Sequence, residues 1–263
     1  MTLSANFPPP PDFSALIREV DPDRFLAGLF VPAEKRPAYF LLCAFNHEIA
    51  RAREVASLGM LALIRLQWWR EVVQGVVRRH DVAEPLGQAL ATGILDRDSL
   101  LAMIDAREME ADAEIADFAS FAAYLEGSAG GFATAAGRLL GADEAVLPRL
   151  RKLGAVYGMA GQLANVAALA RHERCMLPAD RLAAHDLSVH HVMADPNCAT
   201  PVLEELAGQG LGWFDEAHGP LPRAVIAAGL PAVLAARDLK RGVHRRFLGD
   251  RLAVVRSALF GRI

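Results

Sequence analysis

The stretch from residue 44 to residue 70, AFNHEIARAREVASLGMLALIRLQWWR, constrains the fold of this chain more than any other segment. Apolar residues recur in it at helical spacing, first at Phe45, Ile49 and Ala52 and again, after a break near residues 57–59, from residue 61 to residue 72. The pattern predicts one long helix or two joined helices. Because a helix so rich in arginine and tryptophan is unusual in a protein core, we expect part of its surface to line a site.

The other segments of the chain are also helical by periodicity. We expect helices over residues 13–20, 24–30, 34–45, 86–94, 99–116, 118–140, 148–169, 179–184, 201–218 and 222–247, the last with a kink at Pro231. No convincing strand pattern or hairpin turn occurs in the sequence. The sequence therefore predicts an all-α fold, in which residues 1–12 form a flexible proline-rich arm and residues 13–263 a single helical domain.

Length and composition narrow the classes of function. The 263 residues suit one large domain, 53% of them are hydrophobic, and the net charge of −3 gives no reason to expect a nucleic-acid partner. The N-terminus lacks the basic and apolar regions of a signal peptide, and no uninterrupted apolar run reaches the ~20 residues needed to cross a bilayer. Cys43, Cys175 and Cys198 show no metal-binding spacing, so we expect free thiols and a cytoplasmic protein.

Three short strings resemble the squalene/phytoene synthase family. They are DPDRFL at residues 21–26, AFNHEI at residues 44–49 and RLQWWR at residues 65–70, and the resemblance runs in order along roughly the first two-thirds of the chain. It implies a helical bundle like that of the isoprenoid synthases, arranged around a central cavity. The string RLQWWR is similar to the branch of the family that includes a respiratory complex I assembly factor, a branch that is thought to be non-catalytic.

The resemblance also implies where catalytic magnesium would bind. Family members ionise an allylic diphosphate, and Mg²⁺ held by helical carboxylates neutralises the leaving group. In place of the first aspartate motif this chain has ARARE at residues 50–54, in which Glu54 is the only possible ligand. The second motif follows QLAN at residues 162–165, and residues 166–178 contain Glu173 as their only carboxylate. Since both motifs are depleted, we expect no metal cofactor, and Glu54 and Glu173 are weak candidates if Mg²⁺ binds in an enzymatic reaction.

Four arginines on the central segment, Arg51, Arg53, Arg65 and Arg70, have two possible roles. Guanidinium groups match the geometry of phosphate, so these side chains could bind a diphosphate directly. Alternatively, they could pair with the acidic residues between positions 105 and 114, which form one face of the helix expected over residues 99–116. The sequence favours the pairing but leaves both roles open.

The remaining candidates belong to the same expected cavity. Trp68 could line an isoprenoid-sized space or simply pack between helices, and Tyr124 and Ser128 match a family helix that faces the cavity, although the neighbouring glycines could serve close helix packing instead. No catalytic residue is identified. The residues expected to contact a cavity ligand or diphosphate are His47, Arg51, Glu54, Arg65, Gln67, Trp68, Tyr124, Ser128, Gln162 and Asn165.

The C-terminal segment, residues 237–263, carries a separate signal. It contains eight arginines and lysines but only the acids Asp238 and Asp250, interleaved with apolar residues. A basic amphipathic segment suits an anionic membrane surface or an acidic partner. An ordinary terminal helix with a solvated basic face is the alternative, and the sequence does not decide between them.

Two functions compete on these grounds. The first is a non-catalytic factor that assists assembly or binds an isoprenoid or other lipid, acting peripherally at an inner membrane surface or on a membrane protein. The second is a head-to-head prenyltransferase that condenses two prenyl diphosphates to a squalene- or phytoene-like product. The depleted metal motifs favour the first function, because it tolerates their loss and the second does not.

Overall fold

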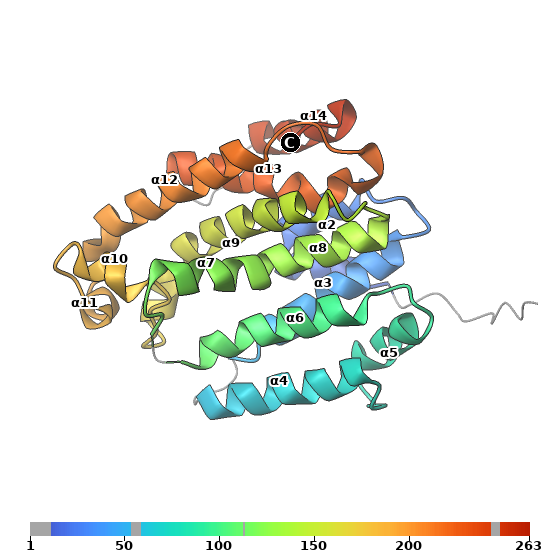
Figure 1. Ribbon diagram of the computed structural model, residues 1–263, viewed down its shortest axis with the longest axis horizontal. Coiled ribbons are helices and arrows are strands. Elements are labelled where there is room, and N and C mark those ends of the chain that lie inside the picture. Colours follow the sequence, from blue (N-terminus) through green and yellow to red (C-terminus); the bar gives the residue numbers. More distant parts are fainter. Residues whose placement is uncertain (1–11, 54–58, 113, 243–247) are drawn as a thin grey trace, which may run out of the picture.

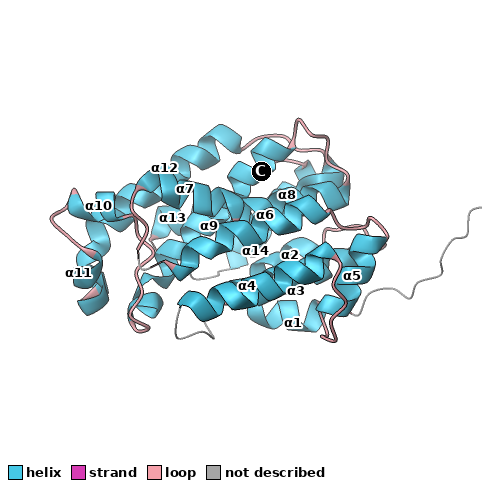
Figure 2. Ribbon diagram, turned by 60° about the horizontal axis from the view of Figure 1, so that its bottom comes forward, coloured by secondary structure: helices cyan, strands magenta, loops and turns pink. Residues whose placement is uncertain are grey.

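The computed structural model describes residues 12–53, 59–112, 114–242 and 248–263. Helices dominate this part of the chain, which forms no strand, and its two isolated bridges join Ile115 to Pro178 and Pro220 to Arg262. Figure 2 shows the same composition of helices and loops. The prediction of an all-α fold is therefore confirmed.

Most of the long helices run roughly along the long axis of the molecule and form an elongated bundle (Figure 1). Those of the first half are α1 (Ser14–Val20), α2 (Pro22–Gly28), α3 (Arg36–Ala50), α4 (Gly59–Gln74), α5 (Ala83–Ala91), α6 (Arg97–Glu108), the 3₁₀ turn η1 (Met109–Ala111) and α7 (Phe118–Gly127). Those of the second half are α8 (Ala129–Leu140), α9 (Leu147–Ala170), α10 (Ala179–Ala183), α11 (Val189–Ala194), η2 (Pro196–Ala199), α12 (Thr200–Ala217), η3 (Arg223–Val225), α13 (Ile226–Arg241) and α14 (Leu248–Phe260). In Figure 1, α4 and α6 lie along one edge of the bundle, and α14 lies along the opposite edge.

Helix α9 is the central element of the bundle. It packs against α7, α8, α12 and α13, and its buried residues extend from Leu147 to Ala170. By length and composition alone α9 could cross a membrane. Its four helical neighbours account for that composition, since a helix enclosed by others is apolar over much of its circumference.

The central segment of the sequence forms two helices, α3 and α4, which agrees with the expected break. Helix α3 is buried along most of its length, whereas α4 is covered on one face only. The two helices are joined by an edge-to-face contact between Phe45 and Trp69, whose ring centroids lie 5.7 Å apart. The connection through residues 54–58, which includes the candidate ligand Glu54, lies outside the described residues.

Some of the expected helix boundaries are wrong. The single helix predicted over residues 118–140 is two helices, α7 and α8, because the backbone turns at Ser128. The Ser128 hydroxyl donates to the Tyr124 carbonyl at 2.6 Å and so satisfies an acceptor at the end of α7. The helix expected over residues 99–116 ends earlier, at Glu108, where η1 takes over.

The contact between α8 and α9 depends on two glycines. A Cβ atom on Gly154 would lie 2.5 Å from the carbonyl oxygen of Ala129, and a Cβ atom on Gly130 would lie 2.6 Å from the carbonyl oxygen of Arg151. Both neighbours are backbone atoms, which cannot move aside as a flexible side chain could. The glycines therefore let the two helices approach backbone to backbone, as the sequence interpretation of close packing expected.

We expect Gly154→Ala to destabilise the fold by about 1–3 kcal/mol, because the added methyl group forces α8 and α9 apart. Gly161→Ala on the same helix is the matched control, since a Cβ atom there would meet nothing within 4 Å. The control should be neutral or stabilising by up to about 1 kcal/mol, from helix propensity alone. Urea unfolding measures both, and equal effects of the two substitutions would contradict the close-contact account.

Candidate functional site

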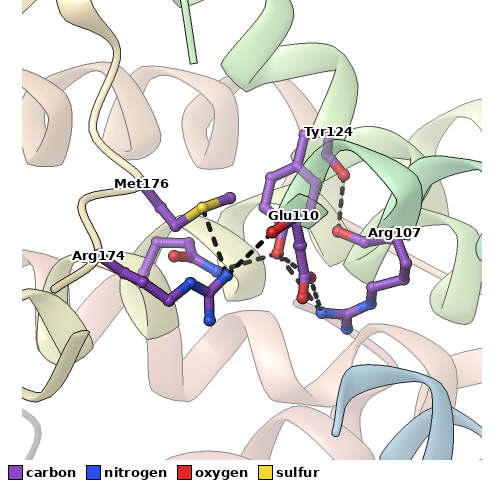
Figure 3. Close-up of polar contacts among 7 residues, drawn as sticks. Arg107, Glu110, Tyr124, Arg174 and Met176 are labelled. Atoms are coloured by element: carbon purple, nitrogen blue, oxygen red, sulfur yellow. Dashed lines mark hydrogen bonds and ion pairs between the residues drawn. The ribbon is translucent and has the colours of Figure 1, made fainter. Parts of the chain in front are cut away.

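A cluster of buried polar side chains lies where α6, α7 and α9 meet the segment that follows α9 (Figure 3). Arg107 and Glu110 form an ion pair at 2.5 Å, and the Tyr124 hydroxyl donates to the same Glu110 carboxylate oxygen at 2.7 Å. The Gln162 amide donates to the Tyr124 hydroxyl at 3.1 Å. Arg174 donates to the backbone carbonyl of Glu110 at 3.4 Å. Four segments distant in the sequence thus converge on Glu110 and Tyr124.

The surroundings of Tyr124 keep its phenol protonated. Glu110 is only 7% exposed, and it pairs with the adjacent Arg107 guanidinium. Burial raises the pKa of Tyr124, and the negative charge of Glu110 raises it further, so the phenol stays protonated and keeps donating its hydrogen. The Gln162 Oε1 atom is buried and has no hydrogen-bond partner among the described residues.

A second buried polar group lies between α2, α8 and α9. The Arg24 guanidinium pairs with Asp21 at 2.9 Å and lies over two aromatic rings, 4.0 Å from the centroid of Phe132 and 5.0 Å from that of Tyr157. The Tyr157 hydroxyl donates to Asp21 at 3.2 Å. Burial raises the pKa of Tyr157, and Asp21 adds to the shift. Arg24 is thereby held by one carboxylate and two ring faces, which suits a charge placed inside a bundle.

The structure brings three of the expected site residues together. Tyr124 and Gln162 belong to the Glu110 cluster, and Ser128 adjoins it through its bond to the Tyr124 carbonyl. Asn165 is exposed, whereas His47 is half-buried.

The candidates on α4 face outward. Arg65 and Gln67 are exposed, and Trp68 is half-buried beside a shallow groove of about 390 Å³ that Met60, Leu63 and Gln67 also line. Arg70 pairs with Asp105 and Glu108 on α6, so for this arginine the expected pairing with the acidic face is confirmed.

The described residues at and near the two expected metal motifs do not form a magnesium site. Arg51 is exposed, Glu173 is exposed in a left-handed turn with φ of 55°, and Glu110 is engaged by Arg107 and Tyr124. In the described ranges, no three His, Cys, Asp or Glu side chains gather as metal ligands would. Glu54 lies outside those ranges.

A cavity of about 690 Å³ opens between α9, α12 and α13. Small and apolar residues form much of its wall, among them Ala160, Leu163, Leu211 and Leu239, and the buried carboxylate of Asp238 borders it. A volume of this order can hold a small apolar ligand. None of the residues expected from the sequence lines this cavity.

Sequence reasoning missed several of these polar residues. Glu110 was grouped with the acidic face of residues 105–114, which was expected to pair with arginines of the central segment, yet η1 turns it inward to Arg107. Asp21 caps α2 by accepting from the Arg24 amide at 3.0 Å, and its second role, toward the Arg24 side chain, was not predicted. For the pairing of Asp21 with Arg24, the available signal was the occurrence of Asp and Arg side by side in the string DPDRFL at residues 21–26, whose other residues are apolar.

The bundle of antiparallel helices, with polar groups enclosed by α2, α7 and α9, defines a protein of the isoprenoid synthase fold. A ligand complex of a dehydrosqualene synthase matches it with a TM-score of 0.75 and 13% identity over 94% of each chain. A squalene synthase from Alicyclobacillus acidocaldarius matches with a TM-score of 0.63 and 16% identity, covering 95% of this chain and 92% of the other. At these identities the likeness shows the fold.

The family follows from the sequence comparison. The model of the family described as squalene/phytoene synthase matches residues 17–257, and the chain belongs to this family. It is also similar to the protein described as NADH dehydrogenase (ubiquinone) complex I, assembly factor 6, with 32% identity over 101 residues to the proteins of Homo sapiens and Bos taurus. That similarity covers 37% of this chain and only 30% of the length of each relative.

Replacing the buried carboxylate should destabilise the protein. We expect Glu110→Gln to cost about 2–3 kcal/mol, because it leaves the nearly buried Arg107 beside a neutral group. Glu108→Gln, two residues away on the exposed surface, is the control and should cost about 0.5 kcal/mol or less. Denaturant unfolding compares them, and a cost for Glu110→Gln no larger than that of the control would contradict the cluster.

The tyrosines provide a test in alkaline solution. Of the three tyrosines of the chain, Tyr39 and Tyr124 are buried and Tyr157 is half-buried, and removal from water is the largest cause that raises each pKa above its ordinary value of 10. Above that pH the unfolded chain releases phenolic protons that the folded chain retains, so stability falls by about 1.4 kcal/mol per pH unit for each tyrosine. Phenolate absorbance should therefore rise together with the loss of helical circular dichroism, and a phenolate signal that precedes unfolding would count against burial.

Proposed function

We propose that this chain is a non-catalytic member of the squalene/phytoene synthase family, which acts by binding, as an assembly or lipid-binding factor at a membrane surface. The observation that carries the proposal is the loss of magnesium ligands at both expected positions. Arginines replace carboxylates after α3, and Glu173 stands alone and exposed after α9.

The chemistry of prenyl transfer explains why this loss matters. Departure of a diphosphate group develops negative charge, which family members neutralise with Mg²⁺ bound to carboxylates. Arginine can bind phosphate, but it cannot hold the metal ion. The buried carboxylate of Glu110 already has Arg107 and Tyr124 as partners and would have to give them up to bind an ion.

The comparisons support a binding role to a limited extent. The relatives at 32% identity are described as assembly factors of respiratory complex I, but the match covers less than a third of their length. A lipid-binding role is supported by the cavity between α9, α12 and α13, whose wall combines alanine and leucine side chains with the charged residues Glu204, Asp238, Lys240 and Arg241. The alternative function, condensation of two prenyl diphosphates, is supported by the fold of the solved synthases.

A turnover assay separates the two functions. The protein is incubated with farnesyl or geranylgeranyl diphosphate and Mg²⁺, with and without NADPH, and its melting temperature is measured with a diphosphate analogue with and without Mg²⁺. We expect no hydrocarbon product and no Mg²⁺-dependent rise in melting temperature, whereas a ligand at 100 times its Kd would add about 2.7 kcal/mol of stability.

The control variants are Arg51→Ala and Glu173→Gln, which should leave the response to Mg²⁺ unchanged because there is no metal binding to lose. Product formation by the unmodified protein would overturn the proposal. A Mg²⁺-dependent stabilisation that Glu173→Gln abolishes would do the same, since it would identify a working metal ligand.

A further inference from the structure

Helix α14 carries a row of exposed apolar side chains along its outer face. Leu248, Leu252, Val255 and Leu259 are all exposed, and at 3.6 residues per turn they fall within roughly 60° of one another around the helix. Phe260, at 76% exposed, extends the apolar surface at the C-terminal end. Such a contiguous apolar row on a surface helix marks a contact site rather than a random exposure of single residues.

The charges around this row have one sign. Arg251 and Arg256 are exposed, and they lie about 70° to either side of the apolar row by helical geometry. Arg262, just beyond the helix, is also exposed. The acid of α14, Asp250, is fully buried and points inward, where Arg237 binds it at 2.5 Å and Arg241 at 2.9 Å. The outer face of α14 therefore presents positive charge beside an apolar row, without an exposed acid on the helix.

The orientation of α14 is fixed by the body of the protein. Its inner residue Val254 is 1% exposed within the main hydrophobic core, and the ion pairs of Asp250 tie the start of the helix to α13. Beyond its end, Ile263 and Gly219 exchange two backbone hydrogen bonds at 2.8 and 3.0 Å. Because both ends are held, the apolar row cannot turn inward and remains on the surface.

From this geometry we propose that the outer face of α14 docks on a bilayer that contains anionic lipids. The apolar row enters the boundary between headgroups and acyl chains, and the arginines on its flanks contact lipid phosphates, as in other interfacial amphipathic helices. The charge complementarity selects an anionic bilayer as the occupant. The inference rests on the proposed membrane-surface role and deepens it by assigning the lipid contact to one helix and one class of lipid.

The placement of α14 also sets the orientation of the molecule. Helix α4, with its own exposed apolar residues Met60 and Ile64, lies along the opposite edge of the bundle in Figure 1 and faces the viewer in Figure 2, where α14 lies behind it. A flat bilayer in contact with α14 therefore leaves α4 in water. The surface of α4 carries the exposed Arg65 and the half-buried Glu71, so its charges are of both signs, unlike those on the outer face of α14.

The test is flotation of the full-length protein with vesicles of phosphatidylcholine alone or mixed with phosphatidylglycerol. We expect binding to the mixed vesicles only, with a loss of at least tenfold in apparent affinity on raising the salt from about 0.1 to 0.5 M. The double variant Arg251→Glu/Arg256→Glu should lose at least tenfold. Leu252→Ser/Leu259→Ser should also lose binding although its charge is unchanged.

The matched control is Leu63→Ser/Ile64→Ser on α4, which removes the same kind of apolar surface from the opposite edge and should bind as the unmodified protein does. Circular dichroism and melting temperature establish that each variant is folded. Absence of binding to anionic vesicles, or binding that the α14 variants leave intact, would overturn the inference and leave an acidic protein partner as the occupant to consider. Both results are independent of the turnover assay. A protein that forms no product and does not bind anionic vesicles would therefore contradict this inference and leave the proposed absence of catalysis intact.

Discussion

The backbone contact between α8 and α9 is the constraint on which the rest of the structure depends. Gly130 and Gly154 let the two helices meet at a distance that any side chain would prevent. With α9 held there, α7, α12 and α13 pack around it, and Gln162 and Tyr157 on α9 reach the two buried polar groups. A shift of α9 away from α8 would separate Tyr157 from Asp21 and Gln162 from Tyr124 together.

These polar groups are also consistent with the proposal that this member of the synthase fold acts without synthase chemistry. In each group the charges are compensated within the protein, Glu110 by Arg107 and Arg24 by Asp21 with two aromatic rings. A buried charge without such partners would cost several kcal/mol. Both buried charge groups are therefore compensated by side chains of the protein itself, which agrees with the proposed non-catalytic role.

The sequence could predict the elements that depend on local rules. Helical periodicity located most of the helices, although not all of their boundaries. Asp96, a residue type that favours helix N-caps, accepts from the Ser99 amide at 2.9 Å, and Gly141 ends α8 in a left-handed conformation. It could not predict features that depend on tertiary packing. Whether Glu110 faces water or Arg107, and whether Trp68 faces a cavity or solvent, is decided by which helix covers which face, and that information is spread over the whole chain.

The central claim is that the fold has lost its metal site, and electron paramagnetic resonance of Mn²⁺ as a substitute for Mg²⁺ tests it most directly. The spectrum of free Mn²⁺ is recorded while the protein is added, first alone and then with a non-hydrolysable prenyl diphosphate analogue. The account predicts that the protein does not reduce the free Mn²⁺ signal below the level set by the analogue alone. A further loss of signal in proportion to protein would contradict it, because carboxylates such as Glu54 and Glu173 would then be assembling a site around the bound diphosphate.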